Sequence, residues 1–390
     1  MRICFQCDEY PPGPHGGIGT LIQLLARGLV RHGHQVRVIG IYPQAYPAAD
    51  YEEDEGVRVW RVRGPNWRFG SVVARWRVYR MIADWSRRGE VEVVEVSDYG
   101  APAAGWPRLP VPVIARLSGS ASFFAVEMRR ALPRRFHLEK ASLRRVDFWC
   151  SESRYLADRT RTLFRLRTGP AAIIYNPVEI PLASSREPRF AQRVVFAGTL
   201  TAKKGVLSLA KSWPLVLKSI PGAELHLWGK DTRNDDGQSV LTQLQAAFNG
   251  VAGTSVRFHG HVPLQELLTV FQTARVAVLP SYSEGFALTP MHAMAAGCPT
   301  IYTRRASGPE LIEDGQDGLL VDPDRPADIA EAVVRLLRDD ELAHRLGAAG
   351  RRRIAEAFSL STLIPENERF YTDCVAAFAA GRSAKRRTAG

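Results

Sequence analysis

Two adjacent lysines stand where their charges could bind a ligand. Lys203 and Lys204 follow the strand-like run RVVFAG and come directly before Gly205, where a helix is expected to begin. A lysine at the carboxyl end of a buried parallel strand is well placed to meet a phosphate. The alternative is a pair of solvated lysines at a helix start, although the helix dipole mildly disfavours cations there.

The segment LPSYSEGFALTPMHAMAAGCP combines a carboxylate with a row of backbone donors. Glu284 lies in the loop that follows the strand-like run RVAVLP. Thr289 is expected to cap the next helix, Pro290 fits its first turn, and Gly297 is expected to end it. A carboxylate beside N–H donors can bind sugar hydroxyls, which need acceptors as well as donors. The donors expected at this helix start are the N–H groups of Gly285, Phe286, Ala287, Leu288 and Thr289.

A third candidate is the glycine-rich loop Gly16-Gly17-Ile18-Gly19, which precedes a helix. Glycines let the backbone approach a ligand, and N–H groups at a helix start can hold a phosphate. The spacing disfavours a dinucleotide site, because Ile22 stands where the last glycine or alanine of that motif belongs. The other interpretation is a tight turn that binds nothing.

These segments are embedded in an alternation of strands and helices that runs twice along the chain. Apolar runs of this kind, buried on both sides, suit parallel sheets covered by helices. The first series is RICFQC, QVRVIGI, VRVWRV, VEVVEV, VPVIARL and VDFWCSE; the second is RVVFAG, ELHLWG, SVRFHG, RVAVLP, CPTIYT and GLLVD. Ligands of such sheets bind beyond the carboxyl ends of the strands.

The alternation predicts two α/β domains, residues 1–176 and 193–363. Residues 177–192, which are rich in proline and serine, read as a linker. We expect a helix at 364–380 that packs back toward the first domain, and a basic, mobile tail at 381–390.

Taken together, these motifs resemble the retaining glycosyltransferases of family 4. The resemblance extends over nearly the whole chain. It rests on the GGIG loop, the G-x-L-x-x-x-K-G turn from Gly198 to Gly205, Asn176-Pro177, the run from Pro280 to Phe286, and Glu310. It implies the GT-B fold, two Rossmann-like domains with parallel sheets that face each other across a cleft. It also implies a metal-independent enzyme that moves a hexose-type sugar from a UDP- or GDP-linked donor to a glycan, lipid-linked or small-molecule acceptor. Two alternatives stay open: a non-catalytic subunit and a nucleotide-sugar epimerase of the same architecture.

The resemblance also assigns roles to residues. Lys204 matches the lysine on the donor's diphosphate, and Glu284 matches the glutamate on the donor sugar; these two are the expected catalytic residues. The N-terminal domain is expected to offer the acceptor, and the C-terminal domain to hold the donor. The remaining donor-site residues that the resemblance implies are Gly16, Gly17, Gly198, Thr199, Trp228, Gly229, Val262, Gly285, Phe286, Ala287, Leu288, Thr289 and His292.

Three positions depart from the family pattern. His292 stands where a second glutamate, which accepts bonds from the ribose, is usual. A neutral imidazole accepts one such bond, and losing a bond to an ionised acceptor costs roughly 1.5–3 kcal/mol. Thr199 replaces an arginine, so that Lys204 carries the diphosphate with less help. Ser118 replaces a histidine on the acceptor side, where Arg116 could compensate.

The charge and composition of the chain limit the kinds of partner that it can bind. The net charge is +12, and residues 121–170 hold twelve Arg or Lys against five Asp or Glu. Such a segment either contacts an anionic membrane surface or forms a solvated arginine-rich face. No nucleic-acid-binding module and no metal site are expected. The absence of an export signal and of a long apolar run, with five cysteines expected as reduced core thiols, favours the cytoplasm or the inner membrane face.

Overall fold

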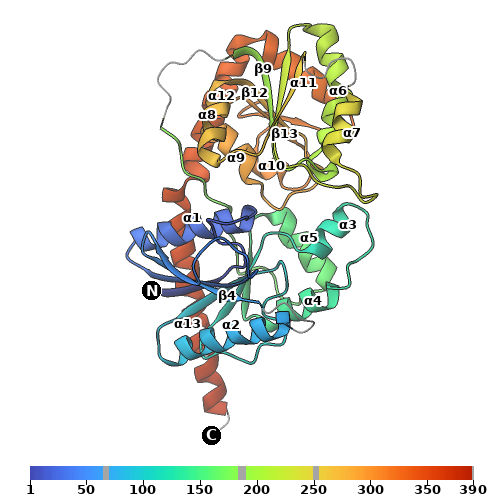
Figure 1. Ribbon diagram of the computed structural model, residues 1–390. Coiled ribbons are helices and arrows are strands. Elements are labelled where there is room, and N and C mark those ends of the chain that lie inside the picture. Colours follow the sequence, from blue (N-terminus) through green and yellow to red (C-terminus); the bar gives the residue numbers. More distant parts are fainter. Residues whose placement is uncertain (65–69, 183–189, 249–253, 389–390) are drawn as a thin grey trace. The chain divides into compact units, whose positions relative to one another are not determined.

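The computed structural model describes residues 1–64, 70–182, 190–248 and 254–388. The chain folds into two compact units (Figure 1). The first comprises Met1–Pro177 together with Leu360–Gly390, and the second comprises Val178–Ser359. The expected domain boundary after residue 176 and the observed one after Pro177 are one residue apart. Residues 183–189 of the expected linker lie outside the described residues.

The first unit is built on an eight-stranded sheet of order β3-β4-β2-β1-β5-β6-β7-β8. All neighbouring pairs are parallel except β3 with β4. The strands are β1 (Arg2–Gln6), β2 (Gln35–Tyr42), β3 (Tyr51–Asp54), β4 (Val57–Arg63), β5 (Val93–Ser97), β6 (Val113–Leu117), β7 (Phe148–Ser151) and β8 (Ala172–Ile173). The helices are α1 (Gly17–Arg31), α2 (Gly70–Arg87), α3 (Ala121–Glu127), α4 (Phe136–Arg145), α5 (Arg154–Phe164) and α13 (Leu360–Thr388).

The second unit is built on a fully parallel six-stranded sheet of order β11-β10-β9-β12-β13-β14. Its strands are β9 (Phe190–Ala197), β10 (Glu224–Trp228), β11 (Val256–Gly260), β12 (Ala274–Leu279), β13 (Thr300–Thr303) and β14 (Leu319–Val321). Its helices are the 3-10 turn η1 (Ala202–Lys204) and α6 (Val206–Ser219), α7 (Val240–Ala247), α8 (Leu264–Thr273), α9 (Leu288–Ala295), α10 (Gly308–Leu311), α11 (Pro326–Arg338) and α12 (Asp340–Ala357).

All twelve predicted strand runs form strands. Most of them supply a short apolar segment that a covered sheet can bury, whereas the edge strand β11 is largely exposed. The added strands β3 and β8 are short strands at the two edges of the first sheet. The apolar face of α1 packs on that sheet through Leu21, Leu25 and Leu29. The helix ends at Arg31, and Gly33 follows with a φ of 86°, close to the predicted C-terminal cap.

The C-terminal helix differs from its prediction at both ends. α13 begins at Leu360 and extends to Thr388, so that residues 381–388 continue the helix and do not form the tail that their charge suggested. Residues 389–390 lie outside the described residues. Ile364, Phe370 and Tyr371 of α13 are buried in the core of the first unit. The helix therefore belongs to that unit, beside which Figure 1 draws it.

The five cysteines are free and buried, as expected for core thiols. Burial raises the pKa of the Cys4 thiol to about 12, so it stays protonated. Among the described residues, no helix combines the length and the apolar character needed to cross a membrane.

Candidate active site

Lys204 and Glu284 come together in the second unit, although they are far apart in the sequence. Lys204 Nζ lies 2.7 Å from Glu284 Oε1. The lysine belongs to the turn η1, which follows β9, and the glutamate to the loop between β12 and α9. Both therefore lie beyond the carboxyl ends of adjacent parallel strands, where this class of sheet binds its ligands.

Backbone contacts fix the lysine turn and the Glu284 loop in position relative to each other. The Tyr282 N–H donates a hydrogen bond of 2.7 Å to the carbonyl of Lys203. Gly205 has a φ of 71°, and a Cβ there would lie 1.8 Å from the carbonyl oxygen of Pro280. Any larger residue at position 205 would push the lysine turn away from the Glu284 loop.

The Lys204–Glu284 pair is largely withdrawn from water. The Glu284 side chain is 7% exposed and that of Lys204 22%. Burial alone would raise the pKa of Glu284, but the ammonium groups of Lys204 and Lys203 outweigh it, and the pKa lies below its usual value. For Lys203, burial lowers the pKa despite the Glu284 charge. Glu284 therefore stays ionised and partly neutralises the two cations around it.

Glycines bring the ends of the central strands close together. A Cβ on Gly229, whose φ is 157°, would lie 1.8 Å from the carbonyl oxygen of Gly198. A Cβ on Gly198 would lie 3.9 Å from Cδ of Lys204, so the lysine stem passes beside the end of β9. Thr199 follows as an exposed residue. The structure thus gathers Gly198, Gly229, Lys204 and Glu284 at one edge of the sheet.

The expected base-binding residues lie at the same edge. The Trp228 side chain is 7% exposed and stacks on His259 with ring centroids 4.2 Å apart. Val262 packs against the same hydrophobic cluster as Trp228. Trp228 therefore offers little open surface, and Val262 is the more accessible of the two.

The helix after Glu284 begins earlier than predicted. α9 starts at Leu288 with Ala287 in the cap position, so the prediction that Thr289 is the N-cap is wrong by two residues. Among the residues that the structure describes, no side chain caps this helix start, so its first N–H groups lack that partner. Pro290 lies within the first turn, as predicted, and Gly297 follows the helix with a φ of 74°. Phe286 packs on Phe358 and anchors the loop.

Oγ of Ser283 and Nδ1 of His292 are buried near this helix and have no hydrogen-bond partner within the described part of the chain. Oε1 of Glu284 has only its ion-pair contact with Lys204. His292 is 8% exposed, and burial lowers its pKa to about 4, so the ring is neutral at neutral pH. Buried polar groups without partners are costly, and they suggest groups that a polar ligand would satisfy. Ser283, one residue before Glu284, was missed by the sequence motifs because they assign it no role.

In the first unit, the glycine loop leads into α1 as predicted. Gly16 is the N-cap residue and Gly17 the first helical residue, and both are exposed. A carboxylate already stands at this helix start, because Glu9 Oε1 accepts a hydrogen bond of 2.8 Å from the Gly19 N–H. Sequence reasoning missed Glu9; an acid in the loop before a glycine-rich helix start was the available signal.

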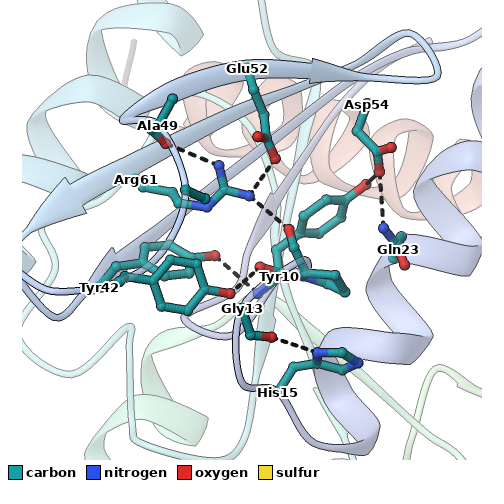
Figure 2. Close-up of polar contacts among 12 residues, drawn as sticks. Tyr10, Gly13, His15, Gln23, Tyr42, Ala49, Glu52, Asp54 and Arg61 are labelled. Carbon is teal, nitrogen blue, oxygen red and sulfur yellow. Dashed lines mark hydrogen bonds and ion pairs between the residues drawn. The ribbon is translucent and has the colours of Figure 1, made fainter. Parts of the chain in front are cut away.

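A tyrosine and arginine network fixes the loop that carries these glycines (Figure 2). The hydroxyl of Tyr42 donates to the carbonyl of Cys7 at 2.7 Å, and that of Tyr46 to the carbonyl of Tyr10 at 2.7 Å. The buried guanidinium of Arg61 donates to the carbonyl of Pro11 at 2.7 Å. The loop backbone is therefore held by side chains from β2, β4 and the segment that follows β2, which preorganises the start of α1.

Arg116 does not fill the acceptor-side role expected for it. Its side chain is 3% exposed, and its guanidinium donates to Glu95 at 2.7 Å and to Asn367 at 2.6 Å. The Tyr371 hydroxyl donates to the same Glu95 carboxylate at 2.8 Å. Arg116 thus ties α13 to β5 and β6. The guanidinium of an arginine in a buried strand needs a carboxylate partner, and Glu95 provides it within the core.

Ser118 instead adjoins two buried carboxyl groups. Its N–H donates to Asp98 Oδ1 at 2.9 Å. Burial raises the pKa of Asp98 to about 7 and that of Glu152 to about 8, although hydrogen bonds from Ser118 and Asn176 favour ionised Glu152. Asp98 Oδ2 is buried without a hydrogen-bond partner among the described residues. Asp98 and Glu152 follow β5 and β7, and the sequence motifs did not single out either of them.

Comparison with known proteins decides the family. A family model described as Glycosyltransferase Family 4 matches residues 15–180, and one described as Glycosyl transferases group 1 matches residues 191–339. A glycogen synthase of Mycobacterium tuberculosis is 28% identical over 95% of this chain and 94% of its own length. The chain belongs to the family 4 glycosyltransferases. It is a glycosyltransferase enzyme, so the family recognised from its motifs is confirmed, while retention of configuration stays a prediction.

Solved structures confirm the GT-B fold class of this glycosyltransferase. Sucrose-phosphate synthase from Thermosynechococcus elongatus superposes with a TM-score of 0.77 at 19% identity, covering 96% of this chain and 99% of that one. HepE from Anabaena, solved with UDP and glucose, superposes with a TM-score of 0.72 at 16% identity, covering 96% and 100%. The cleft expected between facing domains, and the roles of the individual site residues, stay predictions.

Proposed function

We propose that this glycosyltransferase moves a hexose-type sugar from a UDP- or GDP-linked donor to a glycan, lipid-linked or small-molecule acceptor, with retention of configuration. The observation that carries the proposal is the Lys204–Glu284 pair, 2.7 Å apart beyond the ends of β9 and β12. The pair lies next to a helix start without a side-chain cap. An ammonium, backbone N–H donors and a carboxylate acceptor together match the needs of a sugar diphosphate.

Charge development explains why these groups would accelerate the reaction. When the bond between the sugar and the diphosphate breaks, negative charge grows on the phosphate and positive charge on the sugar ring. Lys204 and the first N–H groups of α9 would stabilise the phosphate charge, and each well-placed donor can contribute about 2.7–4 kcal/mol to lowering the barrier. Glu284 would accept hydroxyl hydrogens of the sugar.

The ion pair itself has a consequence for binding. Without donor, Glu284 neutralises much of the Lys204 charge. A bound diphosphate would compete with Glu284 for that ammonium, and the sugar hydroxyls would replace the lysine as partners of the carboxylate. The binding energy of the sugar and that of the phosphate are therefore coupled through this pair.

Other residues are proposed to complete the donor site. The unpartnered Nδ1 of neutral His292 would accept one hydroxyl hydrogen from the ribose. Val262, with the edge of Trp228, would contact the base. Gly16 and Gly17 of the first unit would approach the diphosphate through their N–H groups, in the presence of the negative Glu9 carboxylate.

We propose that the sugar keeps its anomeric configuration because the acceptor attacks from the face that the phosphate leaves. The acceptor hydroxyl attacks on the face that the phosphate leaves, and a departing phosphate oxygen takes the acceptor's proton. Such a path requires neither a separate base nor a metal ion. Asp98, Ser118 and Glu152 of the first unit are proposed to face the acceptor, because they directly follow the neighbouring strands β5, β6 and β7.

The test is a donor screen followed by turnover measurements. Thermal shifts with UDP-, GDP-, ADP- and TDP-sugars identify the nucleotide, and release of that nucleotide then measures turnover. Lys204→Ala is expected to lower turnover at least tenfold, or about 1.4 kcal/mol. The control Lys211→Ala removes an exposed lysine of α6 and is expected to leave turnover unchanged. A chain that neither binds nor hydrolyses any of these donors would instead fit the non-catalytic alternative.

For its place of action, we propose the cytoplasm, with the basic segment 121–170 against an anionic membrane face. Sedimentation with vesicles across a salt series tests this. Binding at low salt that disappears as salt rises is the expected result. No binding at low salt would contradict the membrane part of the proposal and leave sugar transfer untouched.

A further inference from the structure

The outer face of α4 carries a positively charged hollow that sugar transfer does not use. The hollow has a volume of about 530 Å³ and belongs entirely to the first unit. Its six lining residues are Gly105, His137, Lys140, Ala141, Arg144 and Arg145. Three are permanent cations and none is an acid.

The spacing along α4 explains this concentration of charge. His137, Lys140 and Arg144 recur at three- and four-residue intervals, so they share one face of the helix. The single acid of α4, Glu139, is fully buried on the other face and accepts hydrogen bonds from the Ser122 N–H and hydroxyl. No carboxylate of the helix can therefore neutralise the outer face.

The cations of the hollow make no ion pair with an acid among the described residues, although the Lys140 ammonium lies 5.7 Å from the centroid of the Phe136 ring. Arg145 Nε donates to the carbonyl of Trp106, but its Nη2 is buried without an acceptor. Asp147 is the nearby acid, and its Oδ2 already accepts the Val113 N–H at 3.0 Å.

A buried guanidinium nitrogen without an acceptor is costly, and like charges on one helix face repel each other. A bound anion with several oxygens removes both costs, since phosphate accepts hydrogen bonds from arginine and lysine together. We propose that the hollow formed by Lys140, Arg144 and Arg145 is a phosphate-binding site, separate from the sugar-transfer site.

The surroundings favour a phosphate carried by a lipid over a free one. Leu138, on the same helix, is 54% exposed, and Leu132, just before it, is 49% exposed. Apolar side chains beside a cationic hollow suit the headgroup region of an anionic membrane. A free phosphate ester would use the same cations but would have no need of the leucines.

The experiment compares two double variants that each remove two positive charges. Lys140→Gln/Arg144→Gln removes two of the three permanent cations of the hollow and leaves Arg145 with its backbone contact. Arg77→Gln/Arg80→Gln is the control, at two exposed arginines of α2 that lie outside the hollow and outside residues 121–170. Equal melting temperatures establish that both variants fold.

Vesicles of phosphatidylcholine and phosphatidylglycerol (7:3) form the lipid arm, and inorganic pyrophosphate, titrated by calorimetry with UDP present, forms the soluble arm. We expect the hollow variant to bind the vesicles about thirtyfold more weakly, since each cation near an anionic surface contributes about 1 kcal/mol. The control is expected to lose less than about threefold. A loss in the pyrophosphate arm alone would support the site with a soluble ligand. Equal losses in both variants, or no binding of either probe, would overturn it.

Discussion

Removing the positive partner of Glu284 is the most informative perturbation of the proposed site. Lys204→Ala leaves a carboxylate whose side chain is 7% exposed without the ammonium that lies 2.7 Å from it. Breaking a buried pair by deleting one partner costs about 3–5 kcal/mol. Because the Lys204 side chain keeps 22% exposure, we expect the low end, about 3 kcal/mol of unfolding free energy. For a unit of this size that corresponds to a fall in melting temperature of roughly 6–12 °C.

The matching variant separates charge from packing. Glu284→Gln removes the carboxylate's negative charge, so the double variant Lys204→Ala/Glu284→Gln has no stranded anion. We expect the double variant to be more stable than Lys204→Ala alone by about 1–2 kcal/mol. Its turnover is expected to be no better than that of either single variant, because both groups act on the donor. Chemical denaturation measures the stability, and nucleotide release measures the turnover.

The pH dependence gives a further check on the same pair. The pKa of Glu284 in the folded chain lies below its usual value, so its contribution to stability is complete above the unfolded pKa of about 4.3 and is lost as the pH falls through the folded pKa. Lys204→Ala is expected to lose this acid-side contribution. If Lys204→Ala were as stable as the control Lys211→Ala at pH 7 and also turned over normally, the reasoning about the pair would be wrong.

Four other predictions follow from the described geometry. His292→Ala is expected to weaken UDP binding about tenfold, since one hydrogen bond is lost, and calorimetry showing equal affinity would remove His292 from the site. Asp98→Asn is expected to flatten the dependence of the free energy of unfolding on pH. Because the pKa of Asp98 is raised to about 7, the wild type loses stability as the pH rises from about 4 to 7. An unchanged pH dependence in the variant would argue against a buried acid at this position. Arg116→Met is expected to cost about 3–5 kcal/mol by stranding Glu95, measured by denaturation, whereas a small cost together with altered acceptor use would restore its acceptor role. Turnover is expected to survive EDTA, and loss of turnover that Mg²⁺ or Mn²⁺ restores would contradict the metal-independent path.

Much of the fold was predictable because it depends on local patterns. Short apolar runs that alternate with amphipathic helices specify covered parallel sheets, and every predicted strand formed. The gathering of Lys204 and Glu284 was predictable for the same reason, since both follow strands of one parallel sheet. Their direct ion pair was not, because the side-chain distance depends on the contact of Gly205 with Pro280.

The predictions that failed have different physical causes. Arg116 looked available because it lies close to Ser118 at the end of a predicted strand, but its guanidinium donates hydrogen bonds to Glu95 and Asn367 in the core. The basic composition of residues 381–388 suggested a mobile tail, whereas these residues continue helix α13. Asp98 and Glu152 escaped notice because each is a lone acid in the sequence, and only their shared burial makes them unusual.

The central claim is that Lys204 and Glu284 hold the two ends of a sugar diphosphate. A crystal structure with the nucleotide sugar that stabilises the chain most would test it directly. The account predicts a phosphate oxygen about 3 Å from Lys204 Nζ and a sugar hydroxyl at the same distance from Glu284. A donor bound elsewhere, with the lysine and the glutamate still paired only to each other, would contradict it.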